Sequence, residues 1–176
     1  MNHSHLSPLI NTSHLVWSLI LRLTHLIKLI FWIFVFELIA FLLGLLTQAN
    51  IEPWYNSLHK SSLTPPGVVF SIVWSILYAL LGYIAWFLSS NKSQSAKSLI
   101  YLYGAQIIMN WAWTPLFFQF HWIKLSAIWL IVLTCLNWVL IAQLKAKQKT
   151  VALLLLPYVL WLMFASYLAV FIAAMN

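Results

Sequence analysis

Long apolar stretches dominate the chain, and short polar segments separate them. The five longest runs cover about residues 29–47, 67–88, 99–119, 122–144 and 151–173, and none shows the strict alternation of a β-strand. A helix needs about 20 residues to cross a hydrocarbon core of roughly 30 Å, and each run approaches or exceeds that length. Helices also satisfy their own backbone groups in lipid. The pattern predicts an all-α integral membrane protein, a bundle of five transmembrane helices.

A different pattern precedes the first run. One polar stripe recurs there every three or four residues and consists of His14, Ser18, Arg22, His25 and Lys28. Leucine, isoleucine and valine fill most of the other faces, which is typical of an amphipathic helix lying on a membrane surface. A cleaved signal peptide is the alternative, but basic residues interrupt the region where its cleavage site would fall. We expect a tail and interfacial amphipathic helix in residues 1–28, followed by the transmembrane domain in residues 29–176.

Composition and charge agree with a membrane location. Hydrophobic residues make up 64% of the chain and charged residues 6%, and the mean hydropathy is +0.94. The net charge of +7 does not indicate nucleic-acid binding, because no soluble domain presents a basic face. With five spans, one side of the membrane holds Arg22, Lys28, Lys92, Lys97, Lys145, Lys147 and Lys149. The other side holds Lys60 and Lys124, so the N-terminus is expected inside and the first loop outside. The lack of an organelle transit signature favours a bacterial cytoplasmic membrane.

The first loop contains an unusual polar stretch, WYNSLHKSSLTPP, at residues 54–66. Trp54 and Tyr55 follow the first span, where amphipathic aromatic rings favour the headgroup layer. Pro65 and Pro66 fit the first turn of a helix, and Thr64 is a plausible N-cap for it. We therefore expect residues 54–66 to form a lid fixed at both ends, and we call this segment the lid.

Three spans carry stripes that mix large aromatic side chains with amides. The residues on one face are Phe70, Trp74, Leu77 and Leu81 on the second span, Tyr103, Gln106, Asn110, Trp113 and Phe117 on the third, and Tyr158, Trp161, Ala165 and Leu168 on the fifth. The direction of each span places four of these residues between the middle of the membrane and the lid side: Trp74, Asn110, Trp113 and Trp161. They are candidates for one cavity, and ordinary helix packing is the alternative. The amides either bridge helices or contact a ligand. Such a pocket suits a flat apolar ligand with a few polar groups.

Four motifs, in order along the chain, resemble one known family. They are W-Y-x-x-L-x-K followed by T-P-P-G from Trp54, F-x-x-x-W-x-x-L-Y-x-x-x-G from Phe70, Q-x-x-x-N-W-A-W-x-P-x-F-F from Gln106, and P-Y-x-x-W-x-x-F-A from Pro157. Together they resemble the translocator protein or tryptophan-rich sensory protein (TspO/MBR) family. The resemblance runs from about residue 30 to the C-terminus.

This resemblance implies a five-helix bundle, often a homodimer, that binds porphyrins, sterols or synthetic hydrophobic ligands in a pocket closed by the first loop. The ligand-binding residues it implies are Tyr55, Trp74, Asn110, Trp113, Trp161 and Ala165. Some bacterial members are reported to degrade protoporphyrin in light with paired tryptophans, which correspond to Trp74 and Trp161. The expected function is therefore binding of porphyrins, tetrapyrroles or similar flat hydrophobic molecules by a sensor, scavenger or carrier in stress regulation. A light-dependent porphyrin-degrading oxidase is the alternative, and neither activity requires a metal or a cofactor.

Several residues depart from the family pattern. Ser61 and Leu63 replace a proline and a tryptophan in the lid, which places the stiffness of the lid and one aromatic ligand contact in doubt. The tyrosine and basic residue of the animal cholesterol segment are absent, so cholesterol binding is not expected. Glu37 is the only acid expected within the bilayer, where a carboxyl group either has a functional role or bonds to a neighbouring helix. One acid and five unrelated spans do not supply an ion channel or an inverted-repeat transporter.

Overall fold

The computed structural model describes residues 7–90 and 94–176, and within them all regular secondary structure is helical. The predicted tail at residues 1–6 and part of the second loop, residues 91–93, lie outside the described residues. The long helices are α1 Ser7–Ala49, α2 Gly67–Ser90, α3 Gln94–Thr114, α4 Ile123–Lys147 and α5 Lys149–Met175. Two π-helical turns, η1 Ile51–Tyr55 and η2 Pro115–Gln119, follow α1 and α3. The all-α prediction is confirmed.

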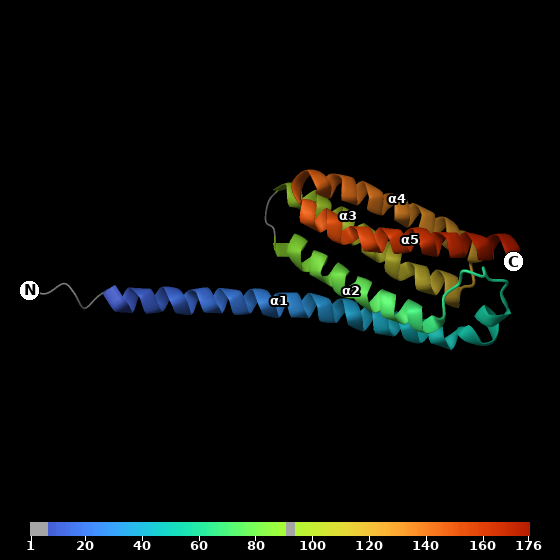
Figure 1. The fold of residues 1–176 in the computed structure, drawn as a ribbon, viewed down its shortest axis with the longest axis horizontal. Helices are drawn as coiled ribbons and strands as arrows, with labels where there is room; N and C mark the ends of the chain where they lie inside the picture. The colour runs from blue at the N-terminus through green and yellow to red at the C-terminus, as the bar shows by residue number, and fades with distance from the viewer. Residues whose placement is uncertain (1–6, 91–93) are drawn as a thin grey trace, which may run out of the picture.

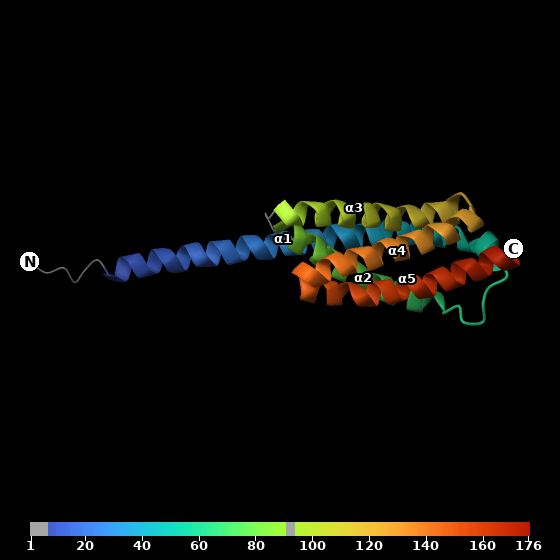
Figure 2. The ribbon, with the colours of Figure 1, turned by 90° about the horizontal axis from the view of Figure 1, so that it is seen from above.

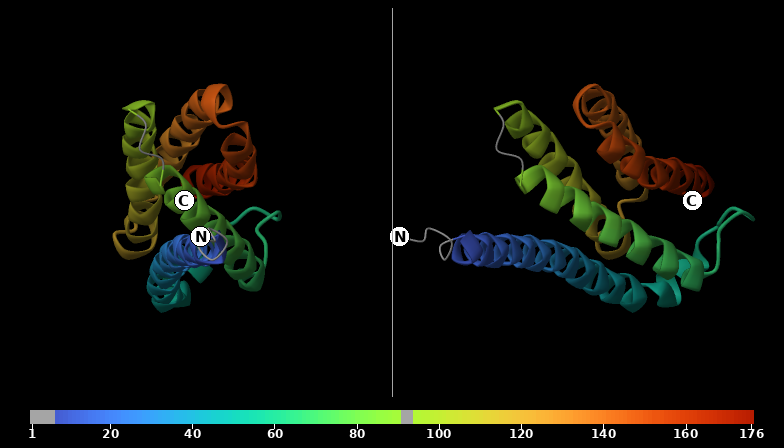
Figure 3. Two further views of the ribbon diagram at one scale, coloured as in Figure 1. Left: turned by 90° about the vertical axis from the view of Figure 1, so that its left-hand side faces the viewer. Right: turned by 60° about the vertical axis from the view of Figure 1, so that its left-hand side comes forward.

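The long helices run side by side in one bundle (Figures 1 and 2). Seen from one end, α4 and α5 lie together on one side of the bundle and α1 and α2 on the other (Figure 3). Among the described residues, α1, α2, α4 and α5 have the length and hydropathy to cross a membrane. α3 is less apolar because its first turns are polar and because it carries Gln106 and Asn110, both of which are buried inside the bundle. Polar groups at membrane depth are tolerated where they face protein.

α1 differs from the prediction at its N-terminal half. Residues 14–28 are helical, as expected, but they continue into the first span without a break. Neither glycine nor proline occurs between Leu9 and Leu43, so the sequence contains none of the usual helix breakers there. The result is a helix of 43 residues whose first part extends beyond the bundle (Figure 1).

α1 and α2 approach each other closely at Gly82. A Cβ atom at this position would lie 2.9 Å from the Cα of Ile33 and 3.1 Å from the carbonyl oxygen of Trp32. Ala40 and Gly44 form a small-x-x-x-small pair on the first span, a sequence pattern that predicts a close helix contact there. Gly44 instead has no atom within 4 Å of a Cβ built on it, so the described residues make no close contact there.

Two predicted boundaries are wrong. Residues 145–150, KAKQKT, lie between the fourth and fifth apolar runs and are predicted to form a loop. In the structure only Gln148 separates α4 from α5, because lysine, alanine and glutamine are all good helix formers. The third span was expected to continue unchanged to residue 119. The α-helix instead ends at Thr114, and Pro115, which cannot donate a backbone hydrogen bond, begins the wider turn η2.

Candidate ligand groove and its lid

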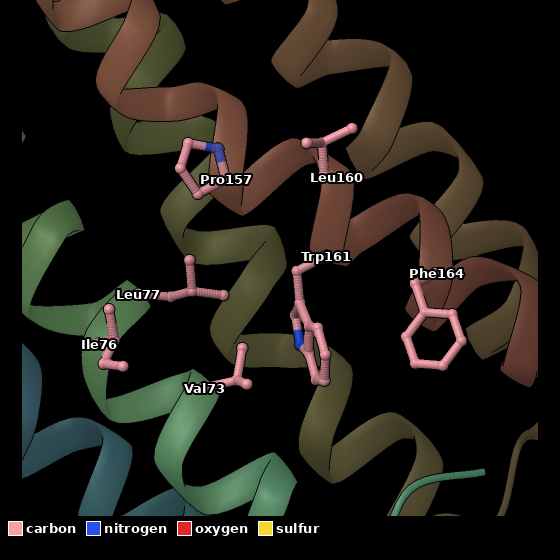
Figure 4. A pocket seen from close by; sticks show the side chains of 7 residues that line it. All are labelled: Val73, Ile76, Leu77, Pro157, Leu160, Trp161 and Phe164. Atoms are coloured by element: carbon pink, nitrogen blue, oxygen red, sulfur yellow. The ribbon is translucent and has the colours of Figure 1, made fainter. Parts of the chain in front are cut away.

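An apolar groove lies between α2 and α5 (Figure 4). Its volume is about 350 Å³, which falls in the lower part of the range for small-molecule sites. The lining side chains are Val73, Ile76 and Leu77 from α2 and Pro157, Leu160, Trp161 and Phe164 from α5. Ile76 is 63% exposed and Leu160 61%, so the groove opens on the outer surface of the bundle.

Trp161 forms the aromatic wall of this groove. Its ring lies edge-on to Phe70 of α2 at 5.6 Å and contacts Phe164 at the same centroid distance. The indole nitrogen is buried and has no hydrogen-bond partner within the described residues. Figure 4 shows this nitrogen on the edge of the ring that is turned toward Val73 and Leu77. An unpaired buried donor costs free energy, and an acceptor that reached it would recover part of that cost.

Trp74 lies in the same interface but not among the residues that line the groove. Its ring is 5.6 Å from that of Tyr78 on α2 and 6.5 Å from that of Tyr158 on α5. Both tyrosines are buried. Trp74 therefore rests against the core between the two helices, whereas Trp161, one turn further along α5 than Tyr158, lines the groove.

Asn110 of α3 joins these two tyrosines. Its Oδ1 accepts a hydrogen bond of 2.8 Å from the Tyr78 hydroxyl, and its Nδ2 donates one of 2.9 Å to the Tyr158 hydroxyl. The Tyr158 hydroxyl in turn donates to Oε1 of Gln106 at 3.1 Å, and Nδ2 of Asn137 on α4 lies 3.4 Å from the same oxygen. Both ends of the Asn110 amide are thus engaged. This polar chain holds α2 and α5, the two walls of the groove, at a fixed separation.

A second aromatic cluster lies at the lid end of the bundle. Trp113 stacks on Phe117 at 5.2 Å with an interplanar angle of 10°, and its indole N–H donates to the carbonyl oxygen of Ser126. Tyr55 contacts Phe118 at 5.5 Å, and the Lys60 ammonium lies 4.8 Å above the Tyr55 ring. Burial raises the pKa of Tyr55, so this phenol remains neutral at physiological pH.

The lid is attached to the C-terminal end of α5. Ser61 is buried, and its hydroxyl shares a hydrogen bond of 3.0 Å with the hydroxyl of Tyr167. The backbone N–H of His59 donates to Oδ1 of Asn176 at 3.0 Å, and Nδ2 of Asn176 donates back to the His59 carbonyl oxygen. The lid therefore crosses from η1 to α5 before it returns to α2 (Figure 3).

The residues that fix the lid are not those the sequence suggested. Thr64 does not cap α2, since its buried hydroxyl has no partner among the described residues and α2 begins only at Gly67. Pro65 and Pro66 lie before the helix rather than in its first turn. Ser61, the departure that made the stiffness of the lid doubtful, supplies a hydrogen bond that a proline could not.

The lid also meets the turn between α3 and α4. The ring of Trp54 stacks on that of His121 at 3.9 Å with an angle of 16°. His121 has a positive φ of 56°, which a non-glycine residue adopts rarely and mostly in tight turns. This contact joins the start of the lid to the turn between α3 and α4.

The six predicted ligand residues thus occupy different places. Trp161 lines the groove, Trp74 and Asn110 lie in the core behind it, and Tyr55 and Trp113 share the lid-end cluster. Ala165, one turn beyond Trp161 on α5, is partly buried against the core. Direct ligand contact by these residues stays a prediction. No local sequence pattern indicates the bonds of Ser61 and His59, because their partners lie more than 100 residues further along the chain.

The fold and the groove define a class: a helical integral membrane protein with an aromatic-walled groove and a loop attached across one end of the bundle. Residues 32–175 match the TspO/MBR family, and the chain belongs to that family.

Similar proteins occur in animals, bacteria and archaea. The pig protein named Translocator protein is 32% identical over 146 residues, which cover 76% of this chain and 83% of the relative. An uncharacterized membrane protein of Bacillus subtilis, YtaB, is 35% identical over 71% of this chain and 81% of its own length. The Tryptophan-rich protein TspO of Archaeoglobus fulgidus is 30% identical over 86% of this chain and 99% of its own length.

Proposed function

We propose that this membrane protein binds a flat hydrophobic ligand of the porphyrin or tetrapyrrole class in the groove between α2 and α5. The observation that carries the proposal is the combination of seven apolar lining residues with one unpaired donor, the indole N–H of Trp161. Apolar walls supply contact area, and a single polar group fixes the orientation of the ligand. A porphyrin offers a broad aromatic face together with carboxylate acceptors at its edge.

The groove is smaller than a complete porphyrin requires, and its outer side is open. One edge of the ring would therefore enter between Trp161 and the α2 side chains, while the remainder would lie against lipid. Access from the bilayer suits a sensor, scavenger or carrier whose ligand is dissolved in the membrane. One relative is named a translocator, which favours movement of the ligand.

Titration with protoporphyrin tests this proposal. Purified protein in lipid nanodiscs is titrated while its tryptophan emission is recorded, and we expect saturable quenching. Trp161→Phe should reduce the quenching, whereas Trp138→Phe, on the exposed surface of α4, is the matched control and should leave the affinity unchanged. Emission that stays unchanged at high porphyrin concentration would overturn the proposal.

A light-dependent oxidase is a second candidate, and the contacts of Trp74 favour it. The indole of Trp74 touches two tyrosines, so an electron lost from one ring could be replaced from the next. In such a reaction the excited porphyrin would take an electron from indole and pass it to molecular oxygen, which is reduced to superoxide and is the oxidant that degrades the porphyrin. We expect illuminated protein to bleach porphyrin faster than the Trp74→Phe, Trp161→Phe double variant does. Equal rates would remove this candidate.

A further inference from the structure

The N-terminal part of α1 lies outside the bundle. Among the described residues, the aromatic contact nearest the N-terminus between α1 and α2 is that of His25 with Trp86, edge-on at 6.4 Å. Toward its N-terminus α1 continues alone (Figures 1 and 2). We call residues 14–24 the arm. Its exposed apolar side chains are Leu15, Val16, Trp17, Leu19, Ile20, Leu21 and Leu23.

The arm cannot share the membrane span of the rest of α1 in a straight helix. The apolar stretch His14–Ala49 has 36 residues, which extend about 54 Å in an α-helix, whereas a hydrocarbon core is roughly 30 Å thick. The C-terminal half of α1 is the part that packs beside α2, so it occupies the bilayer. The arm would then stand in water with its leucines and isoleucines exposed, which is strongly unfavourable. Another surface must cover it.

The basic residues on and near the arm indicate which surface covers it. Arg22 lies on the arm and Lys28 at its base, and the sequence has no acidic residue before Glu37. The same end of the bundle carries Lys97, close to the start of α3, together with the junction of α4 and α5, where Lys145 and Lys149 lie. This excess of cations predicts the cytoplasmic side, where anionic lipid headgroups attract basic segments.

The arm also contains local features that favour a bend. The hydroxyl of Thr24 donates to the carbonyl oxygen of Leu21 at 2.8 Å, and that of Ser18 donates to Leu15 at the same distance. Side-chain bonds of this kind to the preceding turn often bend helices. We propose that α1 bends near Thr24 and that the arm lies on the membrane surface, where Arg22, together with Lys28 at the base of the arm, binds anionic phospholipid headgroups. The apolar faces of the arm then enter the interface between headgroups and acyl chains.

Spin labels on the full chain test the position of the arm. The native cysteine is removed by Cys135→Ser, and single labels are introduced by Leu19→Cys on the apolar face and Ser18→Cys on the polar stripe. The protein is reconstituted in phosphatidylcholine vesicles with or without phosphatidylglycerol. With the anionic lipid present, we expect the label at position 19 to be reached by oxygen and shielded from a water-soluble nickel chelate. The label at position 18 should be reached by the chelate.

Two results would overturn the docked arm. Equal exposure of both labels to the chelate would mean that the arm stands in water. Dipolar coupling between labels on different molecules in dilute vesicles would mean that a second copy covers the arm instead of lipid.

A charge variant tests the choice of lipid. The double variant Arg22→Gln, Lys28→Gln should bind the anionic surface more weakly. We expect the ratio of label 19 shielded from the chelate to label 19 reached by it to fall by about fivefold for each cation removed. Lys124→Gln, at the opposite end of the bundle, is the matched control and should have no effect. Equal shielding in vesicles without phosphatidylglycerol, or no change in the double variant, would overturn the role of anionic lipid.

Discussion

The hydroxyl oxygens of Ser61 and Tyr167 lie 3.0 Å apart, and their hydrogen bond joins the lid to α5 two turns beyond Trp161 of the groove. Ser61 is buried at this contact although it belongs to a loop. The lid is therefore a segment with a specific attachment, and its opening requires this bond to break.

Tyr167→Phe should loosen the lid. The variant removes one hydrogen bond worth about 1 kcal/mol, so the lid should detach about fivefold more often, and a ligand in the groove whose release the lid limits should dissociate about fivefold faster. The measurement is the dissociation rate of protoporphyrin in a stopped-flow competition experiment. Tyr101→Phe is the control, because Tyr101 of α3 is 77% exposed. An unchanged rate in Tyr167→Phe would show that the lid does not limit ligand release.

Asn110 should act mainly on stability. Asn110→Leu leaves the Tyr78 hydroxyl without its acceptor and removes the link to Tyr158, which should cost about 0.5 to 2 kcal/mol in a membrane protein. Thermal unfolding in detergent measures this loss. Cys135→Ala, at an exposed site on α4, should leave the unfolding temperature unchanged.

The same variant separates two roles of the amide. If Asn110 contacted the ligand directly, Asn110→Leu would weaken porphyrin binding while the unfolding temperature stayed the same. A double-mutant cycle with Tyr78→Phe gives the coupling energy of the pair, and additive effects would contradict the hydrogen bond described above.

The substitutions Gly82→Ala and Gly44→Ala should change the stability of the protein in opposite directions. Gly82→Ala places a methyl group 2.9 Å from the Ile33 Cα, so α1 and α2 must separate, at a cost of about 1 to 3 kcal/mol. Gly44→Ala meets no atom within 4 Å and should stabilise the helix by up to about 1 kcal/mol. Unfolding temperatures of both variants check this pair. A Gly82→Ala protein as stable as the parent would contradict the close helix contact.

Much of the fold could be predicted from hydropathy, because a bilayer requires long apolar helices and leaves few alternatives. The ends of helices were less predictable. KAKQKT is polar, which suggested a loop, but its residues favour helix and can project beyond the hydrocarbon. The sequence pattern predicts a separate interfacial helix before residue 29, whereas α1 is continuous there. The pattern changes at that point from a polar stripe to a uniformly apolar composition, and such a change does not by itself break a helix.

The candidate site was only partly predictable. Helical spacing indicated Trp74, Asn110 and Trp161, since these residues recur on faces with other aromatics. Spacing along one helix does not tell which side chain lines a groove and which rests behind it. That difference depends on the rotation of α2 against α5, which the bonds of Asn110 to Tyr78 and Tyr158 help to fix.

The central claim, that the groove between α2 and α5 is the ligand site, is tested most directly by filling the groove with a larger side chain. Val73→Phe adds a ring at a lining position of α2, and Val68→Phe adds the same ring at an exposed position of the same helix. The measurement is the Kd for protoporphyrin in nanodiscs, with unfolding temperatures to confirm that both variants are folded. We predict that Val73→Phe weakens binding at least about tenfold, a loss of ~1.4 kcal/mol, and that Val68→Phe binds like the parent. Full affinity in a folded Val73→Phe protein would contradict the assignment of the groove as the ligand site.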